Sequence, residues 1–103
     1  MDKSSFIQKL NSIELPIGEY YILSSGSLLL YGLREEANDI DLCVSKELFE
    51  STLKEKYKLD DTTKNEYGFY KIAEDVEVVV NDKSDSKYKF EYDIVDGYPV
   101  QKL

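Results

Sequence analysis

The sequence predicts a mixed α/β (α+β) domain in which helices flank a central mixed sheet. Runs rich in β-branched and aromatic residues predict strands at residues 20–24, 39–44 and 76–80. Apolar residues three or four positions apart predict amphipathic helices at residues 2–14 and 46–56. A chain of 103 residues has room for one compact core, so we expect a single domain over its whole length.

The first predicted element is the helix over residues 2–14. Its apolar positions recur at helical spacing, at Phe6, Leu10 and Ile13. Asp2 or Ser4 is suited to cap its start, and Pro16 prevents the helix from continuing. We expect this helix to pack across the sheet and to carry no chemistry.

A strand over residues 20–24, a sharp turn and a helical run over residues 28–33 are expected next. Gly26 lacks a Cβ atom, which permits a close turn and the close approach of a ligand. Ser27 stands at the start of the predicted helix, where unpaired N–H groups and the helix dipole favour an anion. This turn is predicted to hold phosphates, and the alternative is that a serine there is simply an N-cap.

Residues 39–44 alternate acidic and aliphatic side chains and are predicted to form a strand. Because strand side chains alternate between faces, Asp39 and Asp41 share one face, roughly 7 Å apart. Two carboxylates so placed can share a divalent cation, and the alternative is a solvated strand face. A calcium loop of the EF-hand type is excluded because the residues after Asp41 supply no further ligands at alternate positions.

Ser45 is predicted to cap the helix over residues 46–56, whose apolar face is formed by Leu48, Phe49 and Leu53. A short strand at residues 57–59 and a polar turn at residues 60–65 are expected to follow. Both lead into the second half of the sheet.

Two more strands, residues 67–73 and 76–80, are predicted to form a hairpin that turns at residues 74–75. Glu77 interrupts a run of valines, and a carboxylate there is costly to bury unless it is paired or binds a metal. It is the predicted third acid of the site. Asp75 is the fallback, and the alternative for Glu77 is an outward position on an edge strand.

The C-terminal part is predicted to contain a polar loop at residues 81–87 and a final hairpin that turns at residues 96–97. Between them, an edge strand with one aromatic face is expected from the alternation of Tyr88, Phe90 and Tyr92 with charged residues. The nine tyrosines can offer a stacking surface for a base, although aromatic strand faces more often belong to a core.

The charge balance narrows the possible functions. The chain has 21 Asp and Glu against 13 Lys and Arg, which argues against a broad nucleic-acid-binding surface. It contains no His, so a carboxylate would have to serve as general base. The single cysteine, Cys43, suits a reducing compartment and a core position. Since no long apolar run is present, we expect no membrane span and a cytoplasmic location.

Gly26-Ser27, the Asp39-Ile40-Asp41 pair eleven residues on, and Glu77 between two valines occur in a characteristic order. In this order and on these elements, they resemble the signature of the nucleotidyltransferase superfamily related to DNA polymerase β. The resemblance covers roughly residues 20–81. It implies transfer of a nucleoside monophosphate from an NTP, such as ATP, to an acceptor, with release of pyrophosphate.

The resemblance also implies roles for individual residues. Asp39 and Asp41 would bind two Mg²⁺ ions, and Glu77 would bind the one nearer the acceptor and orient or deprotonate its hydroxyl. Gly26 and Ser27 would take the terminal phosphates. Arg34 is a further nucleotide-binding candidate, and its alternative is a surface pairing with the acids that follow it.

Many relatives continue into a helical region after the last strand, whereas this sequence ends soon after its last predicted strand. We therefore expect either a catalytic core that needs a helical partner protein or a piece of a longer chain. The other expected partners are the NTP and an acceptor that is a protein, a small molecule or an RNA end. The alternative function is a non-catalytic nucleotide-binding or partner-binding module that keeps the fold.

Overall fold

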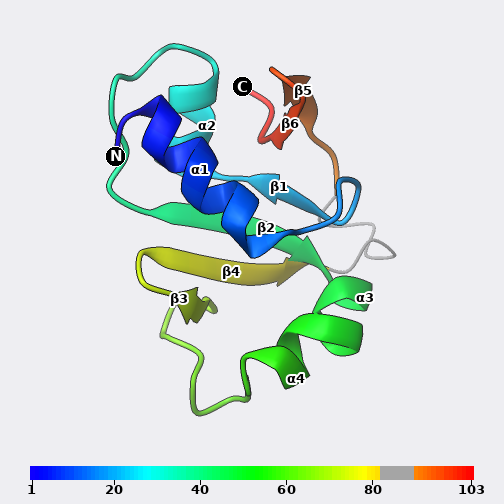
Figure 1. Cartoon of the computed structure of the whole chain (residues 1–103). Coiled ribbons are helices and arrows are strands. Elements are labelled where there is room, and N and C mark those ends of the chain that lie inside the picture. Colours follow the sequence, from blue (N-terminus) through cyan, green and yellow to red (C-terminus); the bar gives the residue numbers. More distant parts are fainter. Residues whose placement is uncertain (82–89) are drawn as a thin grey trace.

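The computed structural model describes residues 1–81 and 90–103, which form helices packed on a six-stranded sheet (Figure 1). The strand order is β3-β4-β2-β1-β6-β5 and the sheet is mixed, which confirms the predicted fold class. Within the described residues, no helix has the length and apolar character needed to cross a membrane.

The helices and strands follow one another along the chain in this order: α1 (Lys3–Ile13), β1 (Tyr20–Ile22), α2 (Ser24–Leu30), β2 (Ile40–Ser45), α3 (Lys46–Leu48), η1 (Phe49–Leu53), α4 (Lys54–Lys56), β3 (Tyr70–Ala73), β4 (Val76–Asn81), β5 (Asp93–Val95) and β6 (Tyr98–Val100). The segments α3, η1 and α4 form one continuous helix with a π-helical middle, which confirms the helix predicted over residues 46–56.

Two predicted hairpins frame the sheet. β3 pairs antiparallel with β4, and β5 pairs antiparallel with β6. Asp75 and Asp96, in the turns, have φ angles of 63° and 53°, in the left-handed region that Asp tolerates better than most residues. The centre of the sheet is built by long-range pairing, with β2 parallel to β4 and β1 parallel to β6.

One face of the sheet carries the hydrophobic core. On β2, the side chains of Ile40, Leu42 and Val44 are fully buried, and they belong to one cluster with the apolar residues of the helices. α1 crosses in front of β1 and β2, with α2 beside it (Figure 1). The opposite face carries the alternate residues of these strands, among them Asp41 and Cys43.

The close packing of α1 on α2 depends on Gly26. A Cβ atom at this position would lie 2.6 Å from Cζ of Phe6 and 2.8 Å from Cγ2 of Ile22. Real Cβ atoms essentially never approach other heavy atoms so closely. Gly26 therefore lets the two helices approach each other over β1.

Both predicted N-caps are confirmed. The carboxylate of Asp2 accepts a hydrogen bond from the backbone N–H of Ser5 at 2.8 Å. The hydroxyl of Ser45 accepts one from the N–H of Leu48 at 3.1 Å and donates to the carboxylate of Glu19. Each cap satisfies an N–H group that has no partner within the helix.

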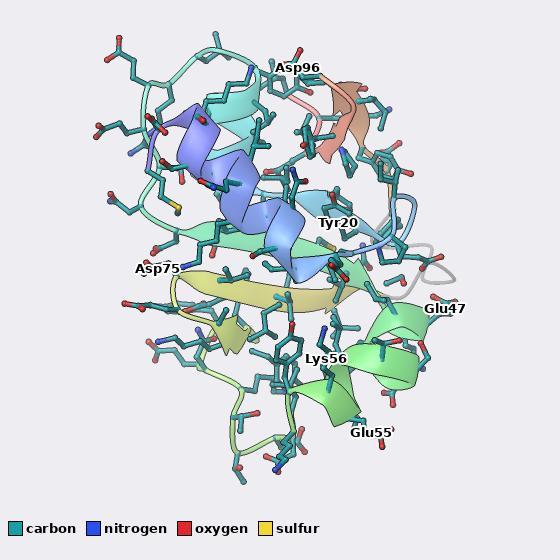
Figure 2. The ribbon with its side chains drawn as sticks, in the orientation of Figure 1. Tyr20, Glu47, Glu55, Lys56, Asp75 and Asp96 are labelled. Carbon is teal, nitrogen blue, oxygen red and sulfur yellow. The ribbon has the colours of Figure 1, made fainter. Side chains whose placement is uncertain are left out.

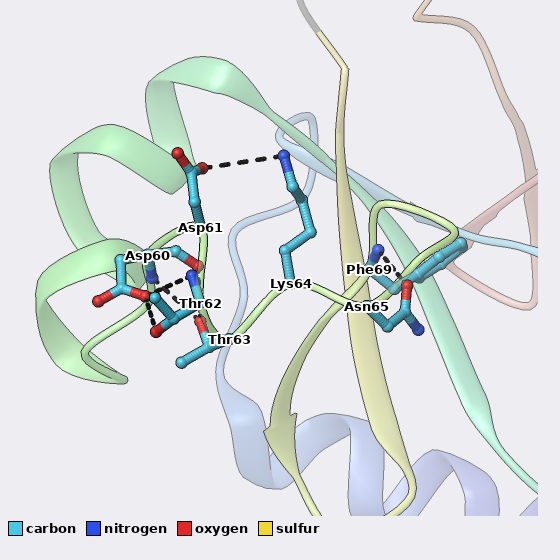
Figure 3. A network of polar contacts seen from close by, with 7 residues as sticks. All are labelled: Asp60, Asp61, Thr62, Thr63, Lys64, Asn65 and Phe69. Carbon is cyan, nitrogen blue, oxygen red and sulfur yellow. Dashed lines mark hydrogen bonds and ion pairs between the residues drawn. The ribbon is translucent and has the colours of Figure 1, made fainter.

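The polar turn predicted at residues 60–65 is also confirmed, and Figure 3 shows its contacts. The carboxylate of Asp60 accepts from the N–H of Thr62 at 2.8 Å. The side-chain oxygen of Asn65 accepts from the N–H groups of Tyr67 and Phe69, each at 2.9 Å. These side chains fix the chain before β3.

Two strand predictions in this region were wrong. Residues 57–59 form a turn, because Lys58 has a φ of 54° and the N–H of Leu59 donates to the carbonyl of Lys54 at 2.8 Å. The strand expected from residue 67 begins only at Tyr70, since Gly68 has a φ of 87° that interrupts extended backbone.

The prediction of an aromatic edge strand was wrong for Phe90 and Tyr92, the two of its aromatic residues that the structure describes. Phe90 and Tyr92 precede β5 and are not part of a strand. Their rings lie against Tyr21 instead, with centroids 5.1 and 6.0 Å from its ring. Tyr88 and the loop expected after residue 81 lie outside the described residues, while Asn81 itself ends β4.

Candidate functional site

The centre of the candidate site is a pair of acids on adjacent parallel strands. Asp41 on β2 lies in register with Glu77 on β4, so both side chains project from the face opposite the core. Lys71 on β3 is in turn opposite Glu77. A row of two carboxylates and one ammonium group therefore crosses three strands of the sheet.

The charges in this row affect one another. The pKa of Asp41 is raised from its usual value, first because the carboxyl is partly buried and then because the charges of Glu77 and Asp39 lie nearby. The three acids that the sequence singled out are thus brought into one electrostatic neighbourhood. Asp39 itself is exposed and stands immediately before β2.

Asp75, the fallback third acid, takes a different place. It is exposed in the turn between β3 and β4 (Figure 2), and its backbone carbonyl accepts from the N–H of Ile40 at 2.7 Å. Its charge is not among the causes that raise the pKa of Asp41, whereas the charge of Glu77 is. The register of Glu77 with Asp41 and the effect of its charge therefore both favour Glu77 as the acid that acts together with Asp41.

The donor set consists of carboxylate oxygens, which are the ligands that Mg²⁺ prefers. Within residues 1–81 and 90–103, no three Asp, Glu or Cys side chains stand close enough together to hold a metal ion as they are placed. Like charges that share a site repel one another, and this repulsion favours spread rotamers of Asp39, Asp41 and Glu77. The oxygen donors of these residues fit a divalent cation by their chemistry, and their placement in the described residues does not bring three of them together.

Sequence reasoning missed a neighbour of Glu77. The side-chain amide of Asn65, in the loop before β3, donates to the carboxylate of Glu77 at 3.4 Å. The same residue anchors the backbone of Tyr67 through its side-chain oxygen. No spacing rule links residue 65 to residue 77, so only the fold brings these groups together.

The predicted phosphate turn has a different form. β1 ends at Ile22 and α2 begins at Ser24, so Gly26 and Ser27 lie inside the first turn of the helix and not in a loop before it. The chain passes from strand to helix at once because Ser24 adopts a φ of 55°. The N–H of Leu23, next to this turn, donates to the carbonyl of Asp41 at 2.8 Å, so α2 starts beside the acids.

Ser27 and Arg34, the two polar candidates for phosphate binding, each bond to a residue close by in the chain. The hydroxyl of Ser27 is buried and donates to the carbonyl of Ser24 at 2.8 Å. The N–H of Ser24 donates to the side-chain oxygen of Gln101 at 3.1 Å. Arg34 is exposed, and its Nε donates to the backbone carbonyl of Glu36 at 2.8 Å, which is a local contact and not the predicted pairing with an acidic side chain.

A cavity of about 470 Å³ opens on the same face as the acids. It is lined by Tyr21, Leu23, Cys43, Tyr67, Val79, Val80 and Asn81. Cys43 and Val79 are register partners one strand repeat beyond Asp41 and Glu77. The cavity therefore adjoins the acidic row along β2 and β4.

The lining of the cavity includes a small group of polar side chains. Tyr21, Cys43 and Asn81 all line the cavity, and Cys43 and Asn81 both affect the pKa of Tyr21. Burial, followed by the contact with Cys43, raises the pKa of Tyr21 to about 12, although Asn81 acts in the opposite direction. Burial also raises the pKa of Cys43, so its thiol is neutral and not a nucleophile at neutral pH.

The acids and the cavity thus adjoin one another on the face opposite the core, and the backbone of Leu23, which precedes α2, is bonded to that of Asp41. Asp41 is the common neighbour, since it lies beside Leu23 on one side and Glu77 on the other. No protein-family model, curated protein or solved structure matches this chain.

Proposed function

We propose that this chain is an Mg²⁺-dependent nucleotidyltransferase, which transfers a nucleoside monophosphate from an NTP such as ATP to a hydroxyl group of an acceptor. The observation that carries the proposal is the register of Asp41 with Glu77 on adjacent parallel strands, with the charge of Asp39 nearby. Carboxylates grouped in this way repel one another unless a cation or a proton joins them. A site that keeps such repulsion is a candidate for metal-assisted chemistry.

Asp39, Asp41 and Glu77 are the residues proposed to hold two Mg²⁺ ions. When bound, the ions would neutralise the negative charge of the phosphates in an in-line displacement. Glu77 has a second proposed task, which is to orient the acceptor hydroxyl and accept its proton. Its contact with Asn65 would keep the carboxylate in place for that task.

The first turn of α2 is the proposed place for the phosphate tail. The residue that precedes it, Leu23, donates its N–H to the backbone carbonyl of Asp41, so the turn follows directly on the strand residues beside the acids. Because the Ser27 hydroxyl donates to the carbonyl of Ser24 and the Ser27 N–H to that of Leu23, we assign the contact to the backbone around Gly26 and not to the Ser27 side chain. Arg34, exposed in the loop before β2, is the proposed cation for the same phosphates.

The test is transfer of label from each α-labelled NTP, with Mg²⁺ and cell extract as the source of acceptors. We expect labelled product with the wild type and none with Asp41→Asn. Asp61→Asn is the control, because the Asp61 side chain is 96% exposed. Asp60→Asn is a poorer control, since Asp60 holds the turn shown in Figure 3. Equal labelling by the wild type and Asp41→Asn contradicts the proposal.

The second candidate function is a non-catalytic nucleotide-binding module. The inward hydroxyl of Ser27 and the contact of Ser24 with Gln101 favour a module without catalysis, because both occupy groups that would have to hold the phosphate tail for transfer. NTP binding by the wild type with no transfer to any acceptor would support this second function. In either case we place the protein in the cytoplasm, where its unpaired Cys43 stays reduced.

A further inference from the structure

The cavity on the acidic face has the size and lining of a small-molecule site. Its volume of about 470 Å³ falls within the roughly 300–1,000 Å³ typical of ligand pockets. Its lining is mainly apolar and aromatic, with Leu23 and Val79 beside two tyrosines. The polar groups of the lining are few, namely the hydroxyls of Tyr21 and Tyr67, the thiol of Cys43 and the amide of Asn81. This combination fits a flat ligand with one polar edge.

The two tyrosines that line the cavity, Tyr21 and Tyr67, differ in how far they are exposed. Tyr21 is 8% exposed and its ring is held by Phe90 and Tyr92 on the side of the later chain. Tyr67 is 76% exposed, although its backbone is tied down by Asn65. One wall is therefore fixed in advance, and the other presents an uncovered ring at the rim. An exposed ring at a pocket rim is suited to stacking on a planar heterocycle.

The cavity is linked to the acids by two routes. Cys43 and Val79 follow Asp41 and Glu77 by one strand repeat, which corresponds to roughly 7 Å. Asn65 contacts the carboxylate of Glu77 with its amide and the N–H of Tyr67 with its oxygen. A ribose joins a phosphate to a base over a similar length, so a phosphate at the acids would bring its base to the cavity.

We infer that this cavity binds a nucleobase, stacked on Tyr67 and hydrogen-bonded on its edge by the amide of Asn81. An amide can donate and accept at once, which matches the paired donors and acceptors on a base edge. The inference rests on the proposed function for its placement beside the acids. The base can come from the NTP or from a nucleotide acceptor, and the two sources give different results in the test.

The test compares the binding of three probes by calorimetry in the presence of Mg²⁺: ATP, inorganic tripolyphosphate, and the dinucleotide ApA. Tyr67→Ala removes the stacking ring, and Val79→Phe fills the cavity. If the cavity holds the base of the NTP, both changes weaken ATP binding by about tenfold or more and leave tripolyphosphate binding unchanged. If it holds the base of an acceptor, they weaken ApA binding to the same degree and spare ATP.

Leu33→Ala is the matched control, because Leu33 is 65% exposed and does not line the cavity. It should leave the binding of all three probes unchanged. The inference is overturned if Tyr67→Ala and Val79→Phe bind ATP and ApA as the wild type does, or if the wild type binds neither probe. Folding of each variant is checked by circular dichroism. Tyr67→Phe, which keeps the ring, should retain the binding that Tyr67→Ala loses.

Failure of this inference is distinguishable from failure of the proposed function. Asp41→Asn should abolish transfer but still bind adenosine, which has no phosphate to contact the acids. If the wild type transfers nucleotides but Tyr67→Ala leaves the affinity for every probe unchanged, only the inference about the cavity is refuted. A protein that binds adenosine in the cavity but never transfers a nucleotide refutes only the enzymatic activity.

Discussion

Asp41 on β2 and Glu77 on β4 are register partners, and the charge of Glu77 contributes to the raised pKa of Asp41. Like charges directly opposite each other in a sheet are destabilising. The pair therefore lowers the stability of the folded state at neutral pH. This destabilising repulsion lies where the sequence pattern and the strand register both indicate a candidate site.

The first prediction concerns the stability of Asp41→Asn. Because the pKa of Asp41 is raised above 3.8 in the folded state, the wild type loses stability as the pH rises from below that value through the raised pKa. The neutral amide avoids this loss, so Asp41→Asn should be more stable near neutral pH by about 0.5 kcal/mol. The advantage should disappear below pH 3.8. Urea unfolding at both pH values measures it, with Asp61→Asn as control.

A second prediction is that Mg²⁺ stabilises the wild type. A cation that binds only the folded state adds about 2.7 kcal/mol at a hundredfold excess over Kd, which raises the Tm of a domain of this size by about 10 °C. Asp41→Asn and Glu77→Gln should each lose most of this rise, whereas Asp61→Asn should keep it. Thermal unfolding with and without Mg²⁺ is the measurement. Equal shifts in all four proteins would show that the acids form no cation site.

Gly26→Ala provides a third prediction, which tests helix packing. Alanine favours a helix over glycine by about 1 kcal/mol, but the added Cβ would lie 2.6 Å from Phe6, and such overpacking costs about 1–3 kcal/mol. The clash should outweigh the gain in helix propensity, so the free energy of unfolding should fall by about 1 kcal/mol. Ser25→Ala on the same helix is the control.

The partner of this clash offers a sharper check. Phe6→Leu shortens the side chain that the new Cβ would meet, so the double variant Phe6→Leu, Gly26→Ala should be more stable than the sum of the two single effects predicts. Additive effects in the double-mutant cycle would place the cost of Gly26→Ala elsewhere.

The fourth prediction concerns Ser45, which is fully buried at the start of α3. Ser45→Ala removes the cap on Leu48 and the donor to Glu19, so unfolding should become easier by about 1–2 kcal/mol. Ser45→Thr keeps a hydroxyl and should retain part of that stability. Ser51→Ala, at an exposed serine of the same helix, should change little. Guanidinium unfolding with a constant m value would confirm that only stability has changed.

The features that could be predicted from the sequence are those fixed by neighbouring residues. The alternation that begins at Asp39 predicted a strand over residues 39–44 and its buried face, and the structure has this strand at Ile40–Ser45. The capping residues Asp2 and Ser45 predicted the starts of their helices. The final hairpin followed from the turn residues at 96–97. In each case the signal and the structure lie within a few residues of each other.

The features that escaped prediction depend on unusual backbone or on distant contacts. The junction of β1 and α2 was misplaced because Ser24, and not a glycine, adopts the left-handed conformation there. The role of Gly26 as a packing position depends on Phe6, which belongs to another helix. In the candidate site, the acids were named from their pattern, but Asn65 and the cavity beside Glu77 arise only when separate strands come together.

The placement of β6 beside β1 has a consequence for folding during synthesis. β1 is synthesised early, but its second neighbour in the sheet is β6, through the pairing of Ile22 with Val100. A contact between residues so far apart in the chain closes slowly, because a long loop must be ordered first. On the ribosome, the edge of β1 that pairs with β6 therefore stays open until Val100 has emerged. During that interval, the hydrogen-bonding groups along the free edge are available to other chains.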